Sequence, residues 1–237
     1  MKIVMLPGLD GTGELFSPML PLLVADYRVI SLPLAGGQDY QTLTEYVQGK
    51  LPNEDFVLLA ESFSGPIAAR IAQTPPTSLR GVIFVATFLS PPVAVLLGVA
   101  QSLPLTRLSR LPFSAALIRW LMLGSQSSDE LLEQFRSIVE HLPAEVVQGR
   151  IRAIRELRLP EFYSALPALY IQARRDRLIP EVKWREFASC FGDISWTVLD
   201  APHFILQTRP EECAVLINRF VESCGQRPDS REAHPCE

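Results

Sequence analysis

Short apolar runs alternate with amphipathic segments along most of the chain. Runs with few polar residues cover positions 2–6, 27–32, 56–60, 79–88, 168–173 and 195–199. Such runs are typical of strands that are buried on both faces, as in a parallel sheet covered by helices. Segments with apolar residues at helical spacing lie at positions 16–23, 40–51, 66–73, 182–190 and 208–224. This alternation predicts an α/β fold with a mostly parallel sheet of about six strands, flanked by helices and joined by right-handed crossovers.

The alternation stops between residues 90 and 160, where no strand is predicted. Helical spacing and helix-start residues predict three helices there, at positions 113–123, 128–141 and 144–157. We interpret residues 90–160 as a helical lid, inserted between the two parts of the core at 1–89 and 161–225. A helical subdomain without a gating role is the alternative interpretation.

Three features of the sequence bear on membrane association, terminal disorder and cellular location. Residues 91–100 are strongly apolar but too short to span a bilayer, so we expect a buried or interfacial helix and no stable membrane insertion. Association of this segment with a membrane surface is a weaker option. Residues 226–237 are polar and contain proline, and we expect them to form a disordered tail. No signal peptide is visible at the start of the chain, which favours a cytoplasmic protein.

Composition and charge narrow the function classes. Of the 237 residues, 48% are hydrophobic and 20% are charged, which is ordinary for a globular protein. The net charge of −4 offers no general attraction to nucleic acid or to an anionic membrane. The four cysteines have no Cys-x-x-Cys spacing and there are only three histidines, so neither a metal site nor a cofactor is predicted. The expected partner is a small-molecule substrate, and the oligomeric state is left open.

An apolar strand runs into a serine and then into a helix that is rich in small residues. Ser62 lies at this turn, which is the layout of a nucleophile elbow, where a strained turn holds a serine hydroxyl clear of the sheet. The usual pattern is Gly-x-Ser-x-Gly, whereas Ala60 and Ser64 flank the serine here and Gly65 comes one position later. Ser64 is a rival nucleophile, but Pro66 fits the first turn of a helix better than the second arm of an elbow.

A glycine-rich loop, PGLDGTG at residues 7–13, follows the first predicted strand. Its Gly-x-x-Gly-x-Gly order differs from the Gly-x-Gly-x-x-Gly of a dinucleotide-binding loop. It also lacks the lysine of a phosphate-binding P-loop. Two interpretations are left: a loop that offers a backbone N–H to an oxyanion, which we favour, and a simple tight turn.

A serine hydroxyl needs a neighbouring base to act as a nucleophile, and we expect that base to be a histidine. His234 lies in the predicted tail, and His141 lies in the inserted block, where a surface role is the simpler interpretation. His203 comes just after the last predicted strand. Because the carboxyl ends of parallel strands meet at one edge of a sheet, Ser62 and His203 are expected on the same rim.

The acid that orients the histidine is expected between them in the chain. Asp176 follows the fifth predicted strand and therefore lies on the same rim. The order serine, aspartate, histidine is the order used by α/β-hydrolases. Arg175 and Arg177 could instead hold Asp176 in a surface ion pair, and Asp200 and Asp193 are the fallback acids.

With these motifs, the chain resembles the α/β-hydrolase fold family, in its small bacterial form, over residues 2–224. The stretches LPGLDGTG (residues 6–13) and AESFSG (residues 60–65) also resemble the matching stretches of the plant phytyl ester synthase group of acyltransferases. The resemblance implies oxyanion donors at the backbone N–H groups of Leu9 and Phe63. There are departures: the chain starts at what would be the family's third strand, and proline replaces the histidine that is common before the oxyanion glycine.

We therefore expect a serine hydrolase that acts on a carboxylic ester or thioester through a triad of Ser62, His203 and Asp176 and an acyl-enzyme. An acyltransferase of the same fold and a protein that binds a small ligand without turnover are the alternatives. The predicted lid is apolar, which favours a substrate with an apolar part. The expected substrate-binding residues are Gly8, Trp120 and Phe204.

Overall fold

A computed structural model describes residues 1–93 and 114–226 of the protein. The predicted tail from residue 227 onward, which includes His234, lies outside the described residues, and so does most of the helix predicted at 91–100. Within the described ranges, no helix has both the length and the apolar character that crossing a membrane requires.

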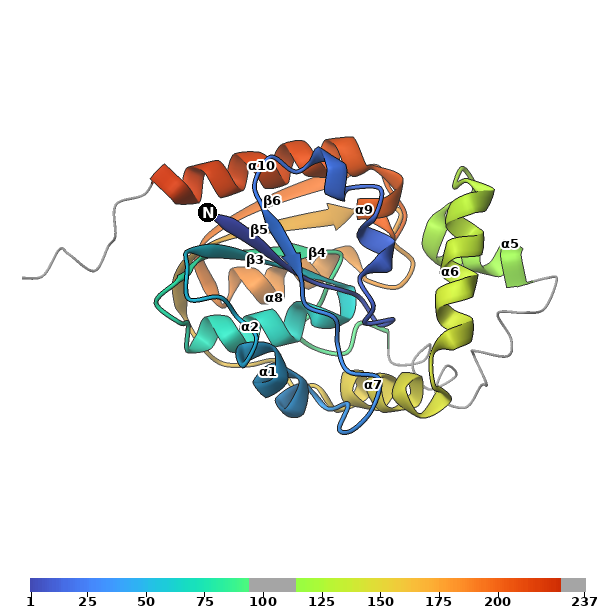
Figure 1. The fold of residues 1–237 in the computed structure, drawn as a ribbon, viewed down its shortest axis with the longest axis horizontal. Helices are drawn as coiled ribbons and strands as arrows, with labels where there is room; N and C mark the ends of the chain where they lie inside the picture. The colour runs from blue at the N-terminus through green and yellow to red at the C-terminus, as the bar shows by residue number, and fades with distance from the viewer. Residues whose placement is uncertain (94–113, 227–237) are drawn as a thin grey trace, which may run out of the picture.

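Six parallel strands form one sheet in the order β2-β1-β3-β4-β5-β6 (Figure 1). They are β1 (Lys2–Leu6), β2 (Tyr27–Val29), β3 (Phe56–Glu61), β4 (Leu79–Val85), β5 (Ser164–Ala173) and β6 (Phe191–Leu199). The predicted parallel sheet is thus confirmed. The chain runs from β1 outward to β2 and then returns to β3 on the other side of β1. The carboxyl ends of β1 and β3 therefore flank the point where the strand order reverses, which is where α/β sheets bind ligands.

Helices cover both faces of the sheet (Figure 1). One face carries α1 (Tyr40–Gln48), α2 (Gly65–Gln73) and α8 (Trp184–Ala188), and the other carries the short α9 (Ile205–Thr208) and α10 (Pro210–Gln226). Two clusters of buried apolar side chains fill the layers between the sheet and these helices. In β3, Leu58 belongs to the first cluster and Leu59 to the second. Burial of both faces explains why this strand is continuously apolar.

The α-helix predicted at residues 16–23 is wrong. Two separate 3₁₀ turns, Glu14–Phe16 and Leu20–Leu22, take its place. Pro18 and Pro21 lack the backbone N–H that the interior of an α-helix needs, so the segment does not close into continuous α-helical turns.

Several other predicted elements are present with shifted ends. The strands predicted at 27–32 and 79–88 are shorter, because β2 ends at Val29 and β4 ends at Val85. The helix predicted at 182–190 begins as a 3₁₀ turn and continues as the short α8. Element ends depend on a few terminal hydrogen bonds, so a pattern of apolar residues defines them poorly.

The inserted block contains α5 (Ser114–Ile118), a π-helical turn (Arg119–Leu123), α6 (Asp129–His141) and α7 (Ala144–Glu156). Ser128 caps α6 at the start of the predicted range, because its hydroxyl accepts a hydrogen bond from the backbone N–H of Leu131 (3.2 Å). The apolar faces of α5 and α6 form a separate cluster with Leu15 and Phe204 of the core. This part of the block therefore sits on the core through a small apolar contact.

In contrast, α7 packs into the main core. Its Ala153 and Ile154 belong to the same cluster as α1, α2 and α8. Val147 and Ile151 form a further cluster that packs against Leu9, in the loop after β1. Figure 1 shows α5 and α6 set apart from the sheet, while α7 reaches toward α1. The movement of residues 90–160 as a lid stays a prediction.

Candidate active site

Ser62 is the first residue after β3, and its backbone φ of +48° lies in the left-handed region that favours glycine. A 3₁₀ turn, Ser62–Ser64, connects it to α2. The hydroxyl of Thr87 donates a hydrogen bond to the carbonyl oxygen of Ser62, which holds the turn from the side of β4. This strained turn between a strand and a helix has the backbone geometry of a nucleophile elbow.

The space beside this turn explains how the elbow accepts its unusual flanking residues. A Cβ atom at Gly65 would lie 2.0 Å from Oγ1 of Thr87, so this position admits no side chain. Ser64 is fully buried, and its hydroxyl donates a hydrogen bond to the carbonyl oxygen of Pro7, in the loop after β1. The position that requires glycine is therefore shifted by one residue, and the serine in the usual glycine place tethers the neighbouring loop.

Ser62, His203 and Asp176 form a continuous chain of hydrogen bonds. Oγ of Ser62 lies 3.0 Å from Nε2 of His203, and Nδ1 of His203 lies 2.7 Å from Oδ2 of Asp176. The three residues follow β3, β6 and β5, so the parallel sheet brings them together at its carboxyl edge. In chemical terms, the imidazole can accept the serine proton while the carboxylate stabilises the imidazolium that forms.

The carboxylate of Asp176 is enclosed, and both of its oxygens are used. The side chain is 2% exposed. Oδ1 accepts hydrogen bonds from the backbone N–H groups of Leu178 (2.8 Å) and Ile179 (2.9 Å), while Oδ2 faces the histidine. The backbone therefore fixes which oxygen points at the imidazole.

The fallback acids have other surroundings. Asp200 pairs at the surface with Arg175, with 2.9 Å between Oδ1 and Nε. Asp193 lies near the start of β6, and therefore at the edge of the sheet opposite the candidate site. Arg175 thus pairs with Asp200, and the carboxylate that accepts the hydrogen bond from His203 belongs to Asp176.

The other candidate base and nucleophile lie away from this chain of hydrogen bonds. His141 is exposed at the end of α6, where its Nδ1 lies 2.6 Å from the carbonyl oxygen of Ser137. This is the surface role that its position at a helix end favours. The hydroxyl of Ser64 donates its hydrogen bond to the carbonyl oxygen of Pro7 and not to the histidine.

The loop after β1 runs against the Ser62 turn. A Cβ atom at Gly8 would lie 3.9 Å from Cβ of Ser62, so the loop backbone passes within contact distance of the candidate nucleophile. The side chain of Phe63 is buried and stacks on Tyr40, with 5.0 Å between ring centroids, so Phe63 can reach the site through its backbone alone. The role of the Leu9 and Phe63 N–H groups as oxyanion donors stays a prediction.

The predicted substrate-binding residues have three different settings. Gly8 lies beside the candidate nucleophile, as described above. Phe204 is buried between the core and α6, with its ring edge-on to Phe135 at 5.5 Å. Trp120 is 56% exposed on the π-helical turn, and Cζ of Arg177 lies 4.7 Å from the centre of its ring. Contact of these residues with a substrate stays a prediction.

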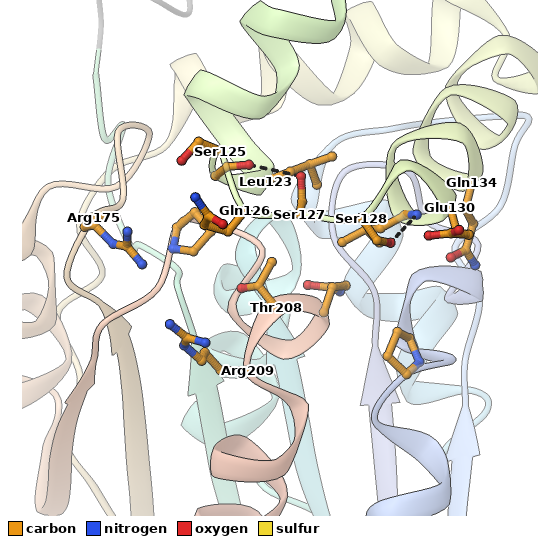
Figure 2. A pocket seen from close by; sticks show the side chains of 15 residues that line it. Leu123, Ser125, Gln126, Ser127, Ser128, Glu130, Gln134, Arg175, Thr208 and Arg209 are labelled. Carbon is orange, nitrogen blue, oxygen red and sulfur yellow. Dashed lines mark hydrogen bonds between the residues drawn. The ribbon is translucent and has the colours of Figure 1, made fainter.

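A pocket of about 380 Å³ opens between the inserted block and the core (Figure 2). Most of the residues that line it are polar or charged, and many of them come from the turn before α6 and from the end of α9: Ser125, Gln126, Ser127, Ser128, Thr208 and Arg209. Figure 2 shows Arg175 and Arg209 on one side and Glu130 and Gln134 on the other. Neither Ser62 nor His203 lines this pocket, but its lining residue Gln207 donates a hydrogen bond to Glu61, the residue before Ser62.

The charge state of His203 reflects opposing effects. Burial disfavours the imidazolium, but the charge and the hydrogen bond of Asp176 favour it, and the charge of Glu61 adds to this. The net result raises the pKa of His203 above its ordinary value of 6.5. The imidazole is therefore protonated over a wider pH range than a free histidine.

Glu61, at the end of β3, is a second titratable group beside the site. It is 6% exposed, and Nε2 of Gln207 donates a hydrogen bond of 3.0 Å to its Oε1. Burial raises the pKa of Glu61 to about 7, which the hydrogen bond from Gln207 and the charge of His203 only partly oppose, and the charge of Asp10 adds to the rise. Glu61 therefore changes its charge near neutral pH.

The sequence analysis did not single out two buried charged residues near the candidate site: Glu61 and Arg150, an arginine on α7. A signal was present in both cases. Glu61 is a carboxylate that directly continues an apolar strand, and Arg150 shares the helical face of Val147 and Ile151. A charged residue on a buried face requires a specific partner, and that requirement could have identified both residues.

We expect Glu61→Gln to stabilise the protein at pH 8 by up to about 3 kcal/mol. Folding raises the Glu61 pKa from 4.5 to about 7, and each pKa unit is worth about 1.4 kcal/mol. Because the folded-state pKa is the higher one, this cost is absent below pH 4.5 and grows as the pH rises toward 7. Urea unfolding at pH 4 and pH 8 measures the difference. Glu45→Gln, at an exposed position of α1, is the control, and a gain in stability at pH 4 equal to that at pH 8 contradicts the prediction.

Metal-binding side chains do not gather near this site or elsewhere in residues 1–93 and 114–226: no three His, Cys, Asp or Glu side chains come together there in an arrangement that could hold an ion.

Comparison with known proteins gives the following likenesses. A sequence profile described as the alpha/beta hydrolase family matches residues 3–216. A search of curated proteins found no match to the chain. Among solved structures, an esterase from Exiguobacterium antarcticum is 16% identical with a TM-score of 0.78, and the match covers 94% of this chain and 92% of the esterase.

Two further structures share the fold. An enol-lactonase from Burkholderia xenovorans is 21% identical with a TM-score of 0.77, over 93% of this chain and 91% of its own. A proline iminopeptidase from Mycobacterium smegmatis is 18% identical with a TM-score of 0.69, over 94% of this chain and 90% of its own. At these identities the likeness shows the fold alone.

Proposed function

Because the chain belongs to the alpha/beta hydrolase family, we propose that it is a serine hydrolase that cleaves a carboxylic ester or thioester with an apolar part. The observation that carries the proposal is the chain of hydrogen bonds from Ser62 to His203 (3.0 Å) and from His203 to Asp176 (2.7 Å). This arrangement supports the proposed roles of Ser62 as nucleophile, His203 as base and Asp176 as orienting acid. No cofactor takes part in the proposed reaction.

In the first half of the reaction, Oγ of Ser62 attacks the acyl carbon while Nε2 of His203 takes the hydroxyl proton. The carbonyl π electrons move to oxygen, and the N–H groups of Leu9 and Phe63 stabilise that oxyanion. Each such donor contributes about 3 kcal/mol in related sites. The tetrahedral intermediate then collapses, and the alcohol or thiol leaves with the proton that His203 holds.

In the second half, water attacks the acyl-enzyme while His203 accepts one of its protons. The second tetrahedral intermediate collapses, the carboxylic acid leaves, and the proton returns to Oγ of Ser62. Asp176 keeps Nδ1 of the imidazole protonated throughout, so that Nε2 is the nitrogen that exchanges protons. The enzyme is thereby restored without net gain or loss of a proton.

The proposed substrate class follows from the surroundings of the site. Leu9 is partly exposed in the loop that passes Ser62, and the inserted block contributes the partly exposed apolar residues Leu121 and Met122. We propose that these side chains lie beside the substrate, where they would favour an apolar acyl or alcohol group. The esterase and the enol-lactonase that share the fold are named for ester and lactone substrates, which supports acyl chemistry as the starting point.

The test is a panel of p-nitrophenyl esters of increasing acyl length, together with acyl-CoA thioesters, assayed in parallel with fluorophosphonate labelling. We expect turnover of at least one activated ester and a single phosphonylated site that peptide mass mapping assigns to Ser62. Products measured with and without added alcohol distinguish hydrolysis from acyl transfer. Tight binding of an apolar ligand, with neither turnover nor labelling, would instead show a binding protein.

The pH dependence provides a further prediction. Since His203 must be unprotonated to act as a base, kcat/KM is expected to rise with pH, with an inflection above 6.5. Glu61→Gln removes a negative charge that raises the His203 pKa, so the inflection should move to lower pH. Steady-state kinetics between pH 5 and 9 measure the shift. Glu45→Gln is again the control, and an inflection that stays in place or moves to higher pH in Glu61→Gln refutes the coupling.

A further inference from the structure

Arg150 is a fully buried arginine on α7, and its hydrogen bonds go to uncharged oxygens. It donates through Nη1 to the carbonyl oxygen of Leu9 (2.7 Å), through Nη2 to that of Pro33 (2.9 Å) and through Nε to Oε1 of Gln38 (2.9 Å). Burial lowers the pKa of Arg150 to about 10, so the side chain keeps all of its donors near neutral pH. Burying a guanidinium without a bonded carboxylate costs free energy, which points to a specific task.

The task concerns the loop after β1, in which three successive carbonyl oxygens each accept a hydrogen bond. Pro7 accepts from the hydroxyl of Ser64, and Gly8 accepts from a backbone N–H three residues later (3.1 Å). Leu9 accepts from Arg150. Because peptide groups are planar, bonds to these carbonyls also fix the direction of the N–H groups between them, including that of Leu9. Arg150 secures the peptide that follows this N–H.

The surroundings of the guanidinium are closed on both sides. A Cβ atom at Gly11 would lie 2.4 Å from Nη1 of Arg150, and Gly11 has a φ of +76°, so the loop can fold over the arginine only with glycine there. On another side, Cζ of Arg150 lies 5.7 Å from the centre of the Phe63 ring, within the range of a cation–π interaction. Arg150 therefore contacts both segments that carry the proposed oxyanion donors.

We propose that Arg150 is a positioning residue for the oxyanion site: it sets the separation and direction of the Leu9 and Phe63 N–H groups. This inference rests on the proposed serine hydrolase function. Arg150 does not touch the reacting atoms, and it acts through the loop and the ring that it holds. Stabilisation by such donors depends on preorganisation, so a loosened loop weakens transition-state binding more than substrate binding.

The experiment compares Arg150→Lys and Arg150→Met with Arg152→Met in the whole protein. Lysine keeps the charge but offers one ammonium group in place of a planar fork, so it cannot reach all three oxygens. Arg152 is exposed on the same helix and is the matched control. The measurements are kcat and KM for the best p-nitrophenyl ester, the inhibition constant of an alkyl boronic acid, and the melting temperature. Fluorophosphonate titration normalises kcat to competent sites.

We expect Arg150→Lys to lower kcat by about 10- to 100-fold and Arg150→Met by about 100-fold or more, with KM changed by less than about threefold. Since boronic acids form a tetrahedral adduct with the serine, their affinity should fall by a factor similar to that of kcat. Arg152→Met should behave as the wild type. If Arg150→Met does not fold, Arg150→Lys decides.

Two outcomes overturn the inference while the proposed function stands. One is an active, labelled wild type whose Arg150→Lys variant keeps wild-type kcat and boronic acid affinity. The other is a variant that only melts at a lower temperature, with normal kcat per titrated site, which would show a purely structural role. A wild type without turnover and without labelling overturns the proposed function itself, and this inference with it.

Discussion

Ser62→Ala is expected to lower kcat/KM for an activated ester by about 10⁴-fold or more. The change removes the atom that forms the bond to the acyl carbon in the proposed reaction, while His203 and Asp176 stay in place. Residual turnover would come from water held near the imidazole and from the oxyanion donors. Initial rates at substrate concentrations well below KM, normalised to folded protein, measure the loss.

Ser64→Ala is the matched control for this prediction. Its hydroxyl tethers Pro7 and does not face the histidine, so the variant should keep fluorophosphonate labelling at Ser62. A moderate loss of turnover, smaller than that of Ser62→Ala, is expected because one bond to the loop after β1 is lost. Labelling that persists in Ser62→Ala and disappears in Ser64→Ala would identify Ser64 as the nucleophile and contradict the proposed role of Ser62.

Asp176→Asn is expected to lower kcat by about 10⁴-fold, with little change in fold. The reason lies in the two backbone N–H groups of Leu178 and Ile179, which already bond to Oδ1. The asparagine carbonyl must stay on these donors, so its NH₂ group must face Nδ1 of His203. Nδ1 then has to accept a hydrogen bond, which moves the imidazole proton to Nε2. In that tautomer the histidine cannot take the proton of Ser62.

The control for Asp176→Asn is Asp200→Asn, which removes an exposed partner of Arg175. We expect activity within about twofold of the wild type and a stability change below about 1 kcal/mol, because surface ion pairs contribute little. The measurement is kcat at the pH optimum of each variant. A large loss in Asp200→Asn together with an active Asp176→Asn would assign the orienting acid to Asp200.

The sequence was informative about the fold because a strand that is buried on both faces must be apolar at successive positions, and such runs are visible in the sequence. The continuous apolar run at β3 predicted a parallel strand, and Leu58 and Leu59 do point into opposite layers. The α-helix predicted at residues 16–23 is absent because two prolines remove backbone N–H groups that an α-helix needs, although the apolar residues have helical spacing. Local backbone chemistry prevailed over periodicity there.

For the candidate site, the sequence predicted neighbours but not contacts. Ser62, Asp176 and His203 each follow a strand, and parallel strands end at one edge, so their shared rim could be predicted from topology. Their hydrogen bonds depend on the exact length of each loop, which no local pattern encodes. The place of Glu61 beside His203 and that of Arg150 under the loop are likewise tertiary, because each requires segments far apart in the chain to meet.

By chain position α7 belongs to the inserted block, but its side chains pack in the core. This limits how segments of the protein can be exchanged with those of its relatives. From the sequence alone, residues 90–160 would be the segment to replace as a whole in order to alter substrate preference. Such a swap would carry away Ala153 and Ile154, which fill the core, and Arg150, which bonds to the loop after β1. A crossover point before Pro143, which precedes α7, leaves these contacts intact. The interchangeable unit of this fold is therefore shorter than the insertion that the alternation of strands and helices outlines.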